Sequence, residues 1–78
     1  MLNADSYPEI ANLCHNLAVL RQRSGLSLRA MAKILHTTPY VVRMLEKGMI
    51  SMHFDVMSIL YARVYFQVSY QQLFDTRL

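Results

Sequence analysis

Helix start and stop signals recur at short intervals in the middle of this 78-residue chain, and they restrict it to short helices. Gly25 and Gly48, the only two glycines, each follow an apolar segment with helical spacing, which is where helices typically end. Ser27 and Thr38 can each cap the first turn of the segment that follows, the latter directly before a proline. Residues 27–47 are therefore expected to hold two short helices joined by a brief turn.

A longer helix is expected before this segment. Apolar residues recur there with the i, i+3, i+4, i+7 spacing of one helical face, at Ile10, Leu13, Cys14, Leu17 and Leu20. Pro8 suits the first helical turn, and Gly25 stops the helix. The pattern predicts a first helix over roughly residues 8–24.

A fourth and a fifth helix are expected after Gly48, within residues 54–74. The linker "MISM" leads to a helix near residues 54–66 whose apolar side comprises Phe54, Met57, Leu60, Tyr61 and Val64. The segment "VSYQQLF" then predicts a turn and a short helix capped by Ser69. Because no segment alternates apolar and polar residues as a strand does, the sequence predicts one all-α domain, a five-helix bundle over residues 1–78.

Positive charge is concentrated in the middle of the chain. Residues 10–53 carry six basic residues against the single acid Glu46, whereas the rest of the chain carries two basic and four acidic residues. The six are Arg21, Arg23, Arg29, Lys33, Arg43 and Lys47. A basic excess on one part of a small chain favours a polyanionic partner for that part, although an ordinary solvated helix surface can carry it as well.

Several functional classes find no support in the sequence. Cys14 is the only cysteine, so we expect no intramolecular disulfide, a reducing cytoplasm, and a buried thiol. His15, His36 and His53 lack metal-ligand spacing, and no nucleophile elbow or ordered triad is present. The segment "MLNADSYPEI" has no signal-peptide pattern, and no apolar run is long enough to span a bilayer. We therefore expect no catalysis, cofactor, metal, small-molecule ligand or membrane partner.

The segment "NLAVLRQRSGLSLRAMAKILHTTPYVVRMLEKG" resembles the helix-turn-helix domains of the Cro and phage-repressor class, often called XRE-like. The matching places are Leu20-Arg21, Gly25-Leu26-Ser27, Ala32, Val42, Leu45, Glu46 and Gly48. The later "YFQVSYQQLF" is similar to the "YFxVSxxxLL" ending typical of the same domains. The resemblance covers about residues 16–74. It implies a lambda-repressor-like helix-turn-helix at about residues 27–47, followed by helices four and five at about 54–74.

Three places depart from the family's pattern. The family usually has a glutamine at the start of the second helix, where it contacts phosphate or base, and this place holds Leu28. His36 stands where a small turn residue is common, and the linker after Gly48 is longer than usual. The first departure removes one DNA contact, and the other two affect local geometry.

The resemblance implies a transcriptional regulator that binds double-stranded DNA with its third helix. We expect a cytoplasmic, nucleoid-associated repressor of a prokaryote, phage or plasmid that acts as a homodimer. By the family's pattern, the base-reading side chains are Thr38, Tyr40, Val41, Arg43 and Met44. Arg43 can make a bidentate contact to guanine, while Val41 and Thr38 can meet thymine methyl groups.

Phosphate contacts are expected from basic side chains and from two helix N-termini. Neutralising phosphates and releasing counterions requires Lys and Arg rather than particular bases, so these contacts would hold the domain on duplex of any sequence. The expected set comprises Arg21, Arg23, Ser27, Arg29, Lys33, Thr37 and Lys47.

Apolar surface leaves an alternative function open. A patch of Tyr40, Val41, Met44 and Met49 would also suit a protein-docking face, so the alternative is a helix-turn-helix scaffold that has lost DNA binding. The second half of the chain has more apolar and aromatic side chains than one small bundle can hide, which predicts a two-fold homodimer. Its interface is expected to include Met52, Phe54, Tyr61, Tyr65, Phe66 and Tyr70.

Overall fold

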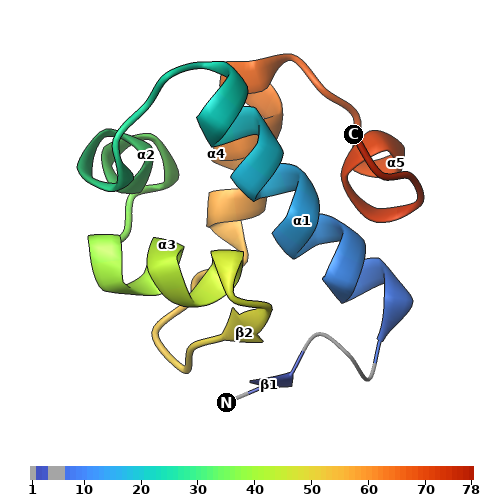
Figure 1. Cartoon of the computed structure of the whole chain (residues 1–78), viewed down its shortest axis with the longest axis horizontal. Helices are drawn as coiled ribbons and strands as arrows, with labels where there is room; N and C mark the ends of the chain where they lie inside the picture. Colours follow the sequence, from blue (N-terminus) through green and yellow to red (C-terminus); the bar gives the residue numbers. More distant parts are fainter. Residues whose placement is uncertain (1, 4–6) are drawn as a thin grey trace.

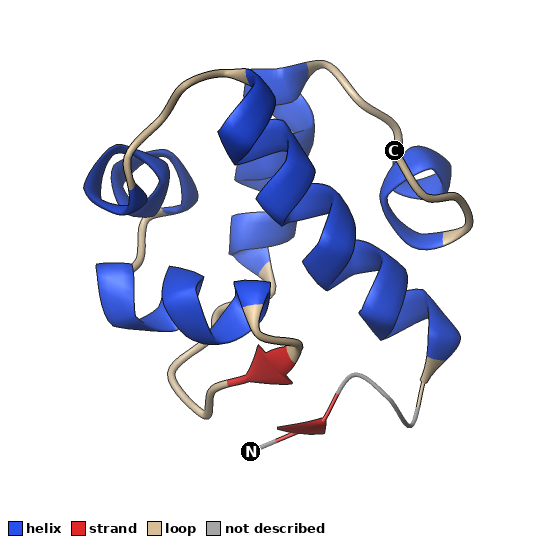
Figure 2. Ribbon diagram, in the orientation of Figure 1, coloured by secondary structure: helices blue, strands red, loops and turns tan. Residues whose placement is uncertain are grey.

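The computed structural model describes residues 2–3 and 7–78, which contain five helices and one pair of two-residue strands (Figure 1). The helices are α1 (Pro8–Arg23), α2 (Leu28–Leu35), α3 (Pro39–Glu46), α4 (Met57–Phe66) and α5 (Tyr70–Phe74). The strands are β1 (Leu2–Asn3) and β2 (Met49–Ile50). The expected helical domain with five helices is confirmed, and strands occupy very little of the described chain (Figure 2).

Side-chain caps set the first residues of three helices. The Ser27 hydroxyl accepts a hydrogen bond from the Ala30 N–H at 3.0 Å. The Thr38 hydroxyl accepts one from the Val41 N–H at 3.3 Å, so both expected caps are present. A reciprocal capping box built on Ser69 starts α5. These bonds satisfy N–H groups that have no partner within their own helix, which fixes where α2, α3 and α5 begin.

Left-handed backbone conformations follow the first four helices. Gly25 and Gly48 adopt φ of 67° and 83°, which glycine reaches without steric strain because it lacks a Cβ. The turns after α2 and α4 instead use His36 and Gln67, at φ of 56° and 55°, a region that non-glycine residues adopt uncommonly. The His36 ring stacks on Tyr61 of α4 with 4.1 Å between ring centroids. This stack holds the turn between α2 and α3 against α4.

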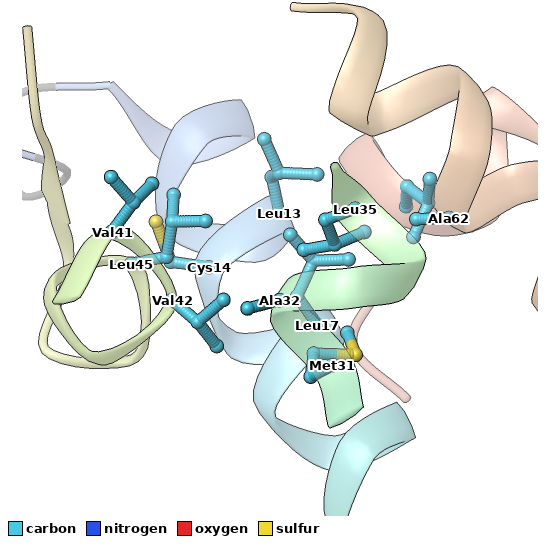
Figure 3. Close-up of a cluster of buried hydrophobic side chains, with 11 residues drawn as sticks. Leu13, Cys14, Leu17, Met31, Ala32, Leu35, Val41, Val42, Leu45 and Ala62 are labelled. Atoms are coloured by element: carbon cyan, nitrogen blue, oxygen red, sulfur yellow. The ribbon is translucent and has the colours of Figure 1, made fainter. Parts of the chain in front are cut away.

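The core lies where α1, α2 and α3 meet, with α4 and α5 added at its sides (Figure 3). The helix α2 packs on α3 and α4, whereas α1 packs on α3 and α5. The fully buried apolar residues are Leu13, Cys14, Leu17, Met31, Ala32, Leu35, Val41, Val42, Leu45, Ala62 and Leu73. The order of the elements thus places α4 against α2 and α5 against α1. In Figure 1, α2 and α5 lie at opposite sides, with α1 and α4 between them.

The inward side of α4 differs from the sequence prediction. Ser58 and Ala62 are buried, whereas Met57 and Val64, which the sequence places on the apolar side, are exposed. The Ser58 hydroxyl donates a hydrogen bond to the Leu35 carbonyl at 2.6 Å. Small side chains let α4 approach the end of α2 closely. Apolar spacing could not identify this face, because α4 is apolar on nearly every side.

The pair of strands is also absent from the sequence prediction. β1 pairs antiparallel with β2, with Leu2 opposite Ile50 and Asn3 opposite Met49. Two-residue strands are too short to produce a visible alternation of apolar and polar residues, so their sequence reads only as a linker. The pairing ties the N-terminal part of the chain to the segment that follows α3.

Two asparagines of α1 hold the C-terminal segment in place. Asn16 is fully buried, and its side-chain carbonyl accepts a hydrogen bond from the Leu78 N–H at 2.8 Å. Its side-chain amide donates at 2.8 to 3.0 Å to three backbone carbonyls, those of Gln72, Leu73 and Thr76. Asn12, one turn earlier, donates to the Phe74 carbonyl at 2.8 Å. The end of α5, whose carbonyls lack helical partners, is therefore capped by side chains of α1.

Replacing Asn16 with alanine is expected to destabilise the domain more than replacing Asn12. The change Asn16→Ala removes one buried and three partly buried hydrogen bonds to the backbone. Their loss should lower the free energy of unfolding by about 1–3 kcal/mol. Asn12→Ala removes more exposed bonds and should cost less. Urea unfolding followed by circular dichroism measures both values. An equal decrease in the free energy of unfolding of the two variants would contradict the role of Asn16 in holding the C-terminal segment on α1.

Candidate functional site

The outer face of α3 carries a short polar and aromatic stripe. Tyr40, Arg43 and Lys47 are exposed and follow the i, i+3, i+7 spacing of one helical face, with the Tyr40 side chain 54% exposed. Thr38, at the start of the helix, is exposed as well, but its hydroxyl is engaged in capping. Three expected base readers, Thr38, Tyr40 and Arg43, thus lie on accessible surface.

Val41 does not belong to this face, so its expected role in base readout is wrong. Its side chain is 1% exposed and lies with Val42 and Leu45 in the core (Figure 3). The cause is helical geometry: Val41 stands one turn before Leu45, so burying Leu45 carries Val41 inward with it. Met44 is half-buried and offers only part of its side chain to a ligand.

Arg21 is committed to an ion pair within the domain. Its Nε donates to Glu46 Oε2 at 2.5 Å, and its Nη2 donates to Glu46 Oε1 at 2.9 Å. Its Nη1 donates to the Leu26 carbonyl at 2.9 Å. The hydrogen bond to Glu46 raises the pKa of Arg21 above its usual value. The structure therefore gives Arg21 a structural role, joining α1 to the end of α3, in place of the expected phosphate contact.

The remaining expected phosphate contacts come from several elements. Arg23 ends α1, the cap Ser27 and the exposed Arg29 stand at the start of α2, and Thr37 is half-buried in the turn before α3. The helices α2 and α3 pack directly on each other, so Arg29 and the outer face of α3 belong to neighbouring helices (Figure 1).

Lys33 and Lys47 border two different surface depressions. Lys33 lines a groove between α2 and α4. Lys47 lines a depression of about 240 Å³ at the other end of α3, together with His15 of α1 and Arg77 of the C-terminal segment. Arg77 also donates to the Asn12 side chain at 3.0 Å. Sequence reasoning missed Arg77 because it lies far along the chain from Lys47 and because only the Asn12 and Asn16 contacts bring it there.

The expected dimer residues separate into exposed and packed groups. Met52, Tyr65 and Tyr70 are exposed, with Met52 reaching 88%. Phe54 and Phe66 pack against the core, which corrects their assignment to an interface. Phe54 precedes α4 and Phe66 is its last residue, and both side chains are half-buried. Tyr61 is half-buried under the His36 stack.

Three further features of the described residues concern metal ligation, membrane crossing and the single cysteine. Across residues 2–3 and 7–78, no group of three or more His, Cys, Asp or Glu side chains is placed to hold a metal ion. In the same part of the chain, none of the helices has the length and apolar character that crossing a bilayer requires. Cys14 is buried as expected, and burial raises the pKa of its thiol to about 11.

Comparison of the chain with protein-family models, with characterised proteins and with solved structures finds no match. The site is therefore defined by its own geometry. Its parts are the outer face of α3, the capped start of α2 and the basic residues around Lys47.

The raised pKa of Cys14 predicts a loss of stability at alkaline pH. The folded protein holds the thiol proton more tightly than the unfolded chain, so this contribution is complete below pH 9 and is lost as the pH rises through about 11. Over that range the free energy of unfolding of the wild type should fall by about 1–3 kcal/mol more than that of Cys14→Ala.

The measurement is urea unfolding of both proteins at a series of alkaline pH values. All other ionisable groups are common to the two proteins, so the difference between the two curves isolates Cys14. Parallel curves would show that the thiol ionises equally well in the folded state.

Proposed function

We propose that the protein is a helix-turn-helix regulator that binds double-stranded DNA with α3 in the major groove. The observation that carries the proposal is the pair α2 and α3: two eight-residue helices, each with a side-chain cap, joined by residues 36–38 and packed on each other. This is the size and connection of a helix-turn-helix unit. The second helix of such a unit enters the groove with its N-terminal part and outer face.

The side chains on that outer face support base and backbone contacts of different kinds. Arg43 is exposed and can donate two hydrogen bonds to guanine. Tyr40 offers a hydroxyl to phosphate or base and a ring to a sugar, while the Thr38 methyl group can meet a thymine methyl. With Val41 in the core, the reading face is less apolar than the sequence implies, and Arg43 carries most of its capacity for discrimination.

Backbone attraction would come from the cations that the fold leaves exposed. Arg23, Arg29, Arg43 and Lys47 are all solvent-accessible, whereas Arg21 is paired with Glu46. Lysine and arginine side chains release counterions from the duplex when they neutralise phosphates, so this term falls with added salt. Repression by occupation of promoter DNA, as a homodimer that reads two half-sites, is the simplest regulatory mode for a domain of this size.

The alternative, a protein-docking face on α3, has lost part of its basis. That face needed an apolar patch, but Val41 is buried and Met44 is half-buried. Among the described residues, Tyr40 is the one large apolar side chain of α3 that is strongly exposed. A single aromatic residue beside cations suits a nucleic-acid surface better than a protein-binding hot spot, which clusters several buried anchors.

Binding to duplex DNA should be measurable by fluorescence anisotropy against mixed-sequence duplex at two salt concentrations. We expect affinity to decrease with salt, because cations on α2 and α3 displace counterions. Selection of bound sequences from random duplex then supplies a preferred site. No binding at low salt, or binding without a salt dependence, would remove the proposal.

Replacing Arg43 tests base readout on the selected site. If Arg43 contacts guanine, Arg43→Ala should lower affinity for the preferred site by about 5- to 150-fold and leave affinity for other sequences nearly unchanged. The matched control is Arg63→Ala, which removes an arginine that lies over the Tyr70 ring, away from α3. An equal loss on all sequences would assign Arg43 to phosphate instead.

A further inference from the structure

The helix α4 is apolar on more sides than the domain can cover. Arg63 is the only charged residue among its ten. A helix that is apolar all round is normally buried on all sides, by its own fold or by a partner. The fold covers one side of α4, through Ser58 and Ala62, which are small. Ile59 and Phe66 also pack against the core, and the other large side chains of α4 are left on its outer side.

The outer side of α4 is a continuous apolar surface, here called the α4 face. It consists of Met57, Leu60, Tyr61, Val64 and Tyr65, which follow the i, i+3, i+4, i+7, i+8 spacing of one helical stripe. Val64 is 64% exposed and Tyr65 is 55% exposed, although both are large and apolar. The α4 face borders the groove of about 470 Å³ between α2 and α4. Contiguous exposed apolar surface of this kind marks an interaction site.

We propose that the α4 face is occupied by the α4 face of a second copy of this chain, with the two α4 helices antiparallel about a two-fold axis. A two-fold interface brings the same patch of both subunits together, which suits one apolar stripe that has no other covering. The proposal rests on the proposed function in one respect, because a regulator that reads two half-sites needs a dimer, and the paired α4 helices would supply it.

Charge complementarity favours a second copy as the occupant. Lys33 is the only cation that lines the groove, and no acidic residue lines it. Asp55 is exposed just before α4, and its Oδ1 accepts the Met57 N–H at 2.8 Å. In an antiparallel pair the start of one α4 lies beside the second half of the other. This arrangement brings the partner's Asp55 to the groove that holds Lys33, so opposite charges meet twice, once on each side of the axis.

The first experiment measures self-association without DNA, by sedimentation equilibrium over a range of protein concentrations. We expect the wild type to dimerise and Tyr65→Asp to raise the dimer Kd at least tenfold, because the change puts a charge into an apolar interface. The matched control is Tyr40→Asp, which alters an equally exposed tyrosine on α3 and should leave the dimer Kd unchanged. Circular dichroism verifies that both variants are folded.

The second experiment exchanges the proposed charge pair. Lys33→Asp and Asp55→Lys should each weaken the dimer, and the double variant should restore it towards the wild-type Kd, because the two charges then meet with signs reversed. Asp75→Lys, an exposed change on the far C-terminal segment, should have no effect. A double variant no better than either single variant would overturn the antiparallel arrangement.

The remaining outcomes separate this proposal from the DNA-binding one. A wild type that stays monomeric at every concentration overturns the second copy as occupant and leaves the α4 face to a different protein. If the protein dimerises but does not bind duplex, the DNA-binding proposal fails and the dimer proposal stands. If the protein binds duplex, and Tyr40→Asp and Tyr65→Asp raise the dimer Kd equally, the DNA-binding proposal stands. The α4 face is then overturned as the dimer interface.

Discussion

The rest of the structure depends on one guanidinium group, that of Arg21. It joins three parts of the chain, because it donates to both carboxylate oxygens of Glu46 at the end of α3 and to the Leu26 carbonyl before α2. A bidentate arginine–carboxylate pair fixes direction as well as distance. The pair therefore helps the buried residues of α3, Val42 and Leu45, to hold the end of this helix against α1.

Local signals in the sequence were sufficient for the helices. Gly25 and Pro39 act through backbone restriction, and Ser27 and Thr38 act through bonds to N–H groups of their own helix, so none of these effects requires knowledge of the fold. The inward side of α4 could not be predicted from such local signals. When nearly every side of a helix is apolar, only its neighbours decide that Ser58 turns inward and Val64 outward.

The candidate site was predictable in outline but not residue by residue. The sequence shows that the cations are concentrated in the middle of the chain, but it does not show that Arg21 pairs with Glu46 while Arg43 is exposed. The burial of Val41 follows from its place one turn before the buried Leu45 on the same side of α3. Arg77 joins Lys47 only because Asn12 and Asn16 hold the C-terminal segment on α1.

The left-handed residue His36 has a mechanical consequence. It is the pivot between α2 and α3, and its ring rests on Tyr61, which belongs to the α4 face. A displacement of α4 would therefore reach this turn through the ring stack, as well as through the Ser58 hydrogen bond to the Leu35 carbonyl. The proposed occupant of the α4 face would therefore lie next to the turn from which α3 begins.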